Sequence, residues 1–258
     1  MPLFIMGKLR KLNSTRLWAG VLLVALAACT APEPHGINDP NEAINRKTHQ
    51  FNRDLDRVLI RRVAGAYGRG LPKPVRQGIG NFASNLNLPS VVVNDILQLK
   101  IGMALKNSTR FLINSTVGIG GVLDPSTALG LPEKRTDFGE TLHVWGVGEG
   151  DYVEVPFIGP STERDVAGMV VDVFTNPLSV LAPKPEKYMV PAAKGVAKLG
   201  DRHDFAKSVN SVLYESADSY AQARLIYLQH RRFQLGQELS FDESPEEGED
   251  AYEDFYAD

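Results

Sequence analysis

Apolar residues that recur at helical spacing between prolines constrain the fold of this chain more than any other sequence feature. After Asp39, in an N-cap position, one apolar stripe predicts a helix over residues 42–62. A second helix is expected to open at Pro72 and to end at Pro89, because proline removes a backbone donor and clashes with the preceding turn. The body of the chain is therefore expected to be mostly helical.

The same periodicity continues through the second half of the sequence. An amphipathic helix is predicted over residues 101–117, another after the capping box that begins at Thr162, and a long terminal helix from Asp201 to about Leu239. Only residues 152–155 alternate like a strand. With no internal repeat and no linker, residues 39–239 are expected to form a single all-α domain.

The N-terminus has the layout of an export signal. Four basic residues precede an apolar run from Leu17 to Ala28, which is too short to span a bilayer. The run ends in Leu26-Ala27-Ala28-Cys29, which resembles the lipobox of bacterial lipoproteins, and Cys29 is the only cysteine. Residues 1–28 are therefore expected to be removed and Cys29 to be lipidated. The alternative is an ordinary signal followed by a free, buried cysteine.

The two ends of the mature chain are expected to lie outside the folded body. Residues 29–38 form a short lipidated spacer, and Thr30 stands where aspartate would signal retention in the inner membrane, which favours the periplasmic side of the outer membrane. Residues 240–258 hold nine acidic residues and no basic one, which is typical of a disordered tail. The near-neutral body argues against nucleic-acid binding.

The sequence contains no recognisable catalytic or metal-binding motif. Its five histidines are scattered without metal-ligand spacing, and no nucleophile elbow is present. One helical face does gather polar groups, and it can be a polar site or simply a face that is solvated or hydrogen-bonded to a loop: Asn45, His49, Asn52 and Asp56.

A family resemblance rests on a series of short motifs spread in order over about residues 38–235. They are Asn38-Asp39-Pro40-Asn41-Glu42, Asn45-Arg46, Phe51-Asn52, Asn81-Phe82, Asn94-Asp95-Ile96-Leu97-Gln98, Asn114-Ser115-Thr116-Val117-Gly118, Gly120-Gly121-Val122-Leu123-Asp124, Asp137-Phe138-Gly139-Glu140-Thr141-Leu142, Trp145-Gly146-Val147-Gly148 and Gly159-Pro160-Ser161. With these motifs behind a lipobox, the chain resembles the MlaA family, also called VacJ.

The resemblance implies a ring of helices that lies in the inner leaflet of the outer membrane of a Gram-negative bacterium. Mislocalised outer-leaflet phospholipids would leave through an amphipathic channel in the ring. Trimeric porins and the soluble periplasmic carrier MlaC would be its partners, the net direction would be retrograde, and outer-membrane lipid asymmetry would be maintained. The resemblance implies neither an enzyme nor a cofactor.

A phospholipid channel needs cations for the phosphate and an apolar lining for the acyl chains, and the amphipathic region 89–117 offers both. The cations are Lys100, Lys106 and Arg110, and the apolar residues are Leu105 and Leu112. Two plainer alternatives stay open, namely that the apolar face packs in the core and that the cations face solvent.

The glycine-rich region 118–139 follows this segment and is expected to be a hinged loop. Gly118, Gly120, Gly121 and Asp124 allow sharp bending, and they coincide with the mobile hairpin that the resemblance implies beside the channel. Two rival functions remain: a structural or adhesion-type envelope lipoprotein without lipid transfer, and a lipid hydrolase.

Overall fold

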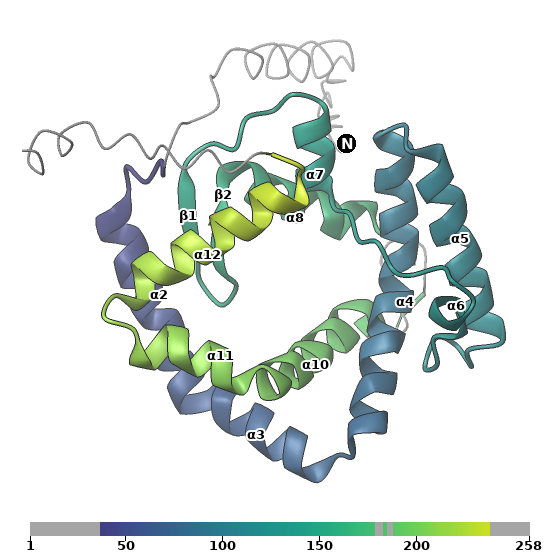
Figure 1. The fold of residues 1–258 in the computed structure, drawn as a ribbon, viewed down its shortest axis with the longest axis horizontal. Coiled ribbons are helices and arrows are strands. Elements are labelled where there is room, and N and C mark those ends of the chain that lie inside the picture. The colour runs from purple at the N-terminus through teal and green to yellow at the C-terminus, as the bar shows by residue number, and fades with distance from the viewer. Residues whose placement is uncertain (1–36, 179–182, 185–187, 238–258) are drawn as a thin grey trace, which may run out of the picture.

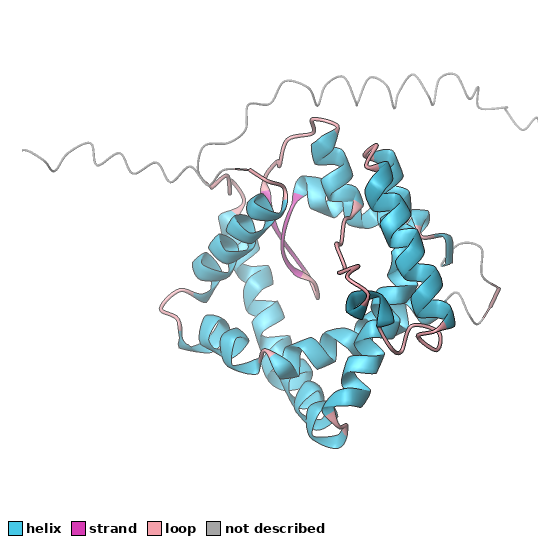
Figure 2. Cartoon of the chain, turned by 45° about the vertical axis from the view of Figure 1, so that its right-hand side comes forward, coloured by secondary structure: helices cyan, strands magenta, loops and turns pink. Residues whose placement is uncertain are grey.

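The computed structural model describes residues 37–178, 183–184 and 188–237. The predicted signal, Cys29 and the acidic tail lie outside the described residues. The helices are arranged in a ring, and a short β-hairpin points toward the middle of it (Figures 1 and 2). The expectation of one mostly helical, ring-like domain is confirmed.

The first part of the ring is an almost continuous helical rod. It consists of α2 (Glu42–Leu55), the π-helical segment η2 (Asp56–Ile60) and α3 (Arg61–Gly70), so the helix predicted over 42–62 extends further than expected. Next comes α4 (Lys73–Leu97), which runs through Pro89 without ending there. The predicted break is wrong because Leu88 and Val91 are buried on either side of Pro89, and this packing compensates for the lost hydrogen bond.

Outside the ring, α5 (Ile101–Thr116) packs against α4 (Figure 1). A tight turn then leads to α6 (Pro125–Ala128), and an extended segment crosses α4 to reach α7 (Phe138–Val144). Asp124 caps α6 and Asp137 caps α7, each accepting a backbone N–H three residues on. The region 118–139 is thus a tight turn and a short helix joined to an extended segment.

The hairpin pairs β1 (Tyr152–Val155), which was predicted, with β2 (Gly159–Thr162), which was not. The second strand was missed because glycine and proline in it gave no alternating pattern. Thr162 then caps α8 (Glu163–Thr175) by accepting the Asp165 N–H, as the capping box predicted.

The prediction of one long terminal helix from Asp201 is wrong, because the structure has several shorter helical segments there. The structure has α10 (Met189–Asp204), α11 (Ala206–Asn210), the π-helical η4 (Ser211–Glu215) and α12 (Ser219–Gln234). Asp218 interrupts the run because its carboxylate accepts the N–H groups of Tyr220 and Ala221 and starts a new helix. After this change of direction, α12 starts beside α2 and runs past the β-hairpin toward α8 (Figure 1).

Ion pairs between remote segments close the ring. Arg231 on α12 donates to Asp137 at 2.7 and 2.9 Å and to Asp165 at 2.8 and 2.9 Å, tying the starts of α7 and α8 together. Burial opposes ionisation of Asp165, but the bonds from Arg231 and Tyr227 outweigh it and lower the pKa of that carboxyl. At the other end of α12, Tyr220 and Arg224 donate to Asp39.

The distribution of polarity is the reverse of that in an ordinary globular protein. Among the described residues, buried polar side chains are more than twice as numerous as buried apolar ones. Large apolar side chains are instead exposed on several helices, among them Ile44, Leu59, Leu105, Leu112, Val173, Phe174, Ile226 and Phe233. So large an apolar exterior indicates contact with lipid or with another apolar surface. Within the described residues, no helix is both long enough and apolar enough to cross a membrane.

Candidate functional site

The segment predicted to supply channel cations, α5, lies on the outer side of α4, away from the middle of the ring (Figure 1). Its polar face, which includes Asn107, Arg110 and Asn114, is buried against neighbouring segments. Its other face exposes Leu105 and Leu112. The helix is amphipathic as predicted, but the apolar face is the one that meets the surroundings.

Arg110 does not have the headgroup-steering position predicted for it. The residue is 2% exposed, and its guanidinium donates to Asp124 at 3.1 Å, to Thr127 at 3.2 Å and to the carbonyl of Leu131. This is a correction of the sequence-based expectation. Arg110 fastens the turn and the following segment to α5, so its charge is already used within the fold.

The other predicted channel residues have more varied surroundings. Lys100 donates to Glu140 on α7 at 2.7 Å, whereas half-buried Lys106 makes no ion pair among the described residues. Leu105 and Leu112 are 66% and 62% exposed. A lipid-contacting role for these four residues stays a prediction.

The glycine turn after α5 is tightly packed. Gly120 and Gly121 have φ values of +69° and +96°, which favour glycine, and a Cβ on Gly121 would lie 2.4 Å from the Cβ of Asn85. Asn85 in turn donates to Ser115 at 2.9 Å and to the Gly120 carbonyl at 3.3 Å. The need for glycine is explained by close approach to α4, and the hinge role of Gly118, Gly120, Gly121 and Asp124 stays a prediction.

Asp124 joins this turn to the largest hollow described here. Burial by itself would raise its pKa, but hydrogen bonds from Thr127, Asn114 and Arg110 lower the pKa of this carboxyl below its usual value. Asp124 is therefore a fixed negative charge on the wall of the hollow.

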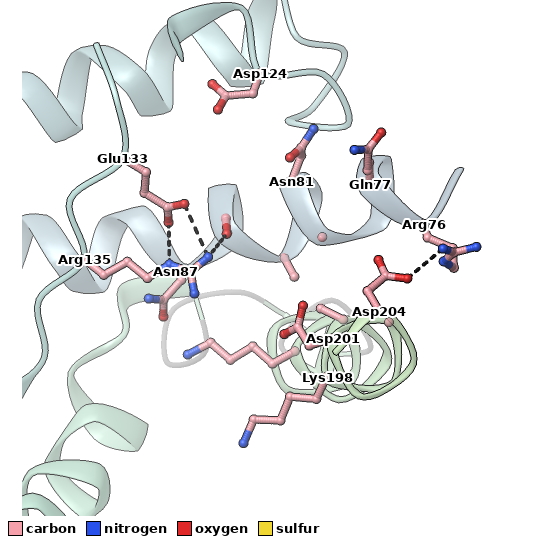
Figure 3. A pocket seen from close by; sticks show the side chains of 16 residues that line it. Arg76, Gln77, Asn81, Asn87, Asp124, Glu133, Arg135, Lys198, Asp201 and Asp204 are labelled. Carbon is pink, nitrogen blue, oxygen red and sulfur yellow. Dashed lines mark hydrogen bonds and ion pairs between the residues drawn. The ribbon is translucent and has the colours of Figure 1, made fainter. Parts of the chain in front are cut away.

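The hollow has a volume of about 690 Å³ and lies between α4, α10 and the segment 124–135 (Figure 3). Its lining mixes both charges with small residues: Arg76, Arg135, Lys194, Lys198, Asp124, Glu133, Asp201 and Asp204 stand beside Gly80, Ala83, Ala197 and Gly200. Arg76 pairs with Asp204 at 2.7 Å and Arg135 with Glu133 at 2.9 Å. Lys198 and Asp201 make no ion pair within the described residues and remain available to a zwitterionic group.

An apolar group stands at the tip of the β-hairpin, the part that points into the ring (Figure 2). Phe157 is 76% exposed and packs edge-to-face on Phe51, with ring centroids 5.3 Å apart. Its φ of +66° is unusual for a bulky residue. Leu99 and Ile119, the other two non-glycine residues with positive φ in the described part of the chain, are also exposed apolar residues in turns. Strained backbone of this kind often marks functional positions.

The polar face of α2 supports the hairpin. Asn45 donates to the Tyr152 carbonyl and accepts the Glu154 N–H, both at 3.0 Å. Asn52 likewise donates to the Val155 carbonyl at 3.0 Å and accepts the Phe157 N–H at 2.8 Å. These two side chains bond the free edge of β1 as a neighbouring strand would, which favours the hydrogen-bonded alternative for this face.

A serine, a histidine and a carboxylate meet beside this face, although the sequence showed no such motif. His49 Nε2 lies 3.1 Å from Ser219 Oγ, and its Nδ1 lies 3.3 Å from Glu154 Oε1. The arrangement resembles a hydrolytic triad. All three side chains are buried, however, and the adjacent N–H groups of Tyr220 and Ala221 already donate to Asp218, so they form no oxyanion hole. The cluster serves to hold α2, β1 and α12 together.

A single-domain helical ring whose buried side chains are mostly polar, and which exposes many large apolar side chains, defines a class of proteins whose surface suits contact with lipid or another apolar surface. The chain belongs to the MlaA lipoprotein family, whose sequence profile matches residues 37–234.

Relatives with the same description span most of the chain. The protein from Escherichia coli K12 named "Intermembrane phospholipid transport system lipoprotein MlaA" is 35% identical over 242 residues, covering 91% of this chain and 94% of its own. The protein of the same name from Haemophilus influenzae is 31% identical and covers 77% of this chain and 79% of its own.

A solved structure has the same fold. It is described as "Structural basis for maintenance of bacterial outer membrane lipid asymmetry", and the superposition gives a TM-score of 0.64 with 32% identity, covering 76% of this chain and 98% of that one.

Proposed function

We propose that this chain is an envelope lipoprotein of a Gram-negative bacterium, anchored through Cys29 on the periplasmic side of the outer membrane. There it removes misplaced phospholipids from the outer leaflet and passes them to a periplasmic carrier of the MlaC kind, which maintains lipid asymmetry. The observation that carries the proposal is the reversed polarity of the ring, since mostly polar buried side chains and many exposed large apolar ones suit a body that sits in the acyl region of one leaflet. The names of the relatives support it.

The path for the lipid would run through the middle of the ring. The hollow beside α4 and α10 offers Lys198 to a phosphate and Asp201 to an ammonium group, which together suit a zwitterionic headgroup. Phe157 at the hairpin tip and Phe51 on α2, which packs against it, would contact the acyl chains. This hollow and the Phe157–Phe51 pair replace α5 as the proposed lining of the path. Leu105 and Leu112 on α5 would face the surrounding acyl region instead.

Two rivals make different predictions. A structural or adhesion-type lipoprotein needs the anchor but no phospholipid, and a hydrolase consumes the lipid it binds. The buried Ser219 cluster gives the hydrolase little support, and we propose that the chain performs no catalysis.

The proposal is tested by extracting the lipidated protein in a mild detergent and analysing what accompanies it. Intact glycerophospholipid and a trimeric porin should co-purify with it, and incubation with added phospholipid should release no fatty acid or lysophospholipid. A preparation free of phospholipid would favour the structural rival, and released fatty acid would favour the hydrolase.

A further inference from the structure

Four arginine side chains gather on the exposed side of η2 and α3, away from the hollow described above. Arg57, Arg61, Arg62 and Arg69, with Gly65, line a depression of about 450 Å³. We call these five residues the arginine groove. Its lining contains no acidic residue, in contrast to the mixed charges beside α10.

The charge of the groove is only partly compensated, because the Asp56 carboxylate attracts Arg61 electrostatically but forms its ion pair with Arg202. Arg57 lies 3.5 Å from Asp54 in an exposed pair, which is a weak interaction. Arg61, Arg62 and Arg69 make no ion pair with any residue that the structure describes. Like charges held this close repel one another, and a bound anion would relieve the repulsion.

A fixed tyrosine, Tyr214, also positions part of the arginine groove. The guanidinium groups of Arg57 and Arg61 lie over the ring of Tyr214, at 5.2 and 5.4 Å from its centroid. Tyr214 is itself fixed, because its hydroxyl donates to Asp56 at 2.7 Å, and Arg202 holds the same carboxylate with two bonds of 2.8 Å. Two of the four cations are therefore positioned before any ligand arrives.

Gly65 provides the space in the middle of the groove. A Cβ at this position would lie 3.2 Å from Nη1 of Arg69, so a side chain here would make the flexible end of Arg69 shift by a few tenths of an ångström. Glycine is unfavourable inside a helix, and here its lack of a side chain leaves the floor of the groove open.

Apolar residues on the same exposed stretch indicate the kind of anion. Val58, Leu59 and Val63 are 62%, 50% and 41% exposed and lie between the arginines in sequence. Cations mixed with exposed aliphatic side chains suit the headgroup level of a membrane, where guanidinium groups bind phosphate in bidentate fashion. An acidic protein surface would not require the aliphatic residues.

We infer that the arginine groove binds the phosphate group of a membrane phospholipid headgroup. The inference rests on the proposed function only in so far as the chain must meet phospholipid. It concerns a headgroup held at η2 and α3, not the lipid that would occupy the hollow beside α10, and so it adds a second, fixed lipid contact.

The test uses the full lipidated chain in mild detergent, titrated with phosphatidylglycerol and followed by native mass spectrometry. Diacylglycerol with the same acyl chains is the probe that lacks phosphate. Two variants alter the groove. The first is the triple change Arg61→Gln, Arg62→Gln and Arg69→Gln. The second is the single change Gly65→Glu, which places a carboxylate on the floor of the groove and puts a better helix former in place of glycine. The matched control removes three exposed cations elsewhere: Lys47→Gln, Lys73→Gln and Lys207→Gln.

Both groove variants should bind phosphatidylglycerol about tenfold more weakly, with diacylglycerol binding unchanged and the control close to the parent. Equal weakening in the control, or no weakening in the groove variants, would overturn the inference. So would displacement of phosphatidylglycerol by an equal concentration of inorganic phosphate, or an effect confined to polyglutamate used as an acidic protein mimic. None of these results bears on phospholipid removal from the cell surface, so the two proposals fail separately.

Discussion

The buried guanidinium of Arg110 controls the turn beside the polar hollow. Replacing Arg110 by Ala leaves Asp124 without its cation, and we expect a loss of about 3 kcal/mol in unfolding free energy. In a chain of this size that corresponds to a fall of roughly 6–12 °C in the thermal midpoint. Lys106→Ala, one helical turn away and without an ion pair, should change the midpoint by no more than about 2 °C. Circular dichroism in one detergent measures both, and equal midpoints would show that Arg110 is not structural.

Substitutions at the exposed Phe157 test function separately from stability. Phe157→Gly relieves an unfavourable positive φ but loses the contact with Phe51, so the midpoint should stay within about 3 °C of the parent. Removal of surface phospholipid should nevertheless fall, because the apolar tip of the hairpin is lost. Phe157→Leu keeps an apolar side chain and should transport nearly as well as the parent. If Phe157→Gly transports normally, the hairpin tip is not part of the lipid path.

At the scale of single elements, the glycine turn can be tested with a matched pair of alanine substitutions. Gly121→Ala introduces a Cβ 2.4 Å from Asn85 at a φ of +96°, and should cost about 2 kcal/mol or more, which is roughly 4–8 °C. Gly102→Ala on α5 meets nothing within 4 Å and should not lower the midpoint. An unchanged midpoint for Gly121→Ala would show that the turn yields easily, as the hinge prediction requires.

The exposed face of α5 gives a prediction about membrane seating. Trp18 lies in the predicted signal, so Trp145 is the only tryptophan of the processed chain, and it is 51% exposed with its Nε1 bonded to the Leu97 carbonyl next to α5. In vesicles of phosphatidylcholine brominated on the acyl chains, Trp145 emission should be quenched. The double change Leu105→Asp and Leu112→Asp should weaken this quenching without unfolding the protein, because both leucines are exposed. Quenching by iodide from the water phase instead would place α5 outside the membrane.

Local sequence patterns predicted the elements whose determinants are local. The Thr162 capping box, the amphipathic 101–117 segment and the 152–155 strand depend on neighbours within a few residues, and all three are present. Pro89 was misjudged because burial of distant partners decides whether a helix survives a proline.

The site was harder to predict than the elements. Contacts over long separations use up the charge of Arg110, bring Ser219 to His49 and place Arg57 and Arg61 over Tyr214. Helical spacing describes one helix at a time, and so it cannot say which face of α5 turns inward. The density of arginine between residues 57 and 69 was a visible signal in the sequence that was not used.

For the whole molecule, closure of the ring depends on α12, which binds segments from both halves of the chain. Asp39 near the start of the described residues and Asp137 and Asp165 in the middle all bond to this helix. Because these ion pairs close the ring, the exposed apolar side chains and the polar hollow keep a fixed relation to one another. The lipid path proposed above depends on that relation.

The most direct test of this account is the amount of phospholipid in the outer leaflet of living cells. In a Gram-negative bacterium deleted for its own MlaA lipoprotein, surface phosphatidylethanolamine is labelled with an amine reagent that does not cross the membrane. Expression of this chain should return the labelling to the level of the undeleted strain, whereas Cys29→Ala, which cannot be anchored, should leave it high. Labelling that stays high while the unaltered chain is present in the outer membrane at a normal level would contradict the proposal that it removes phospholipid from that leaflet.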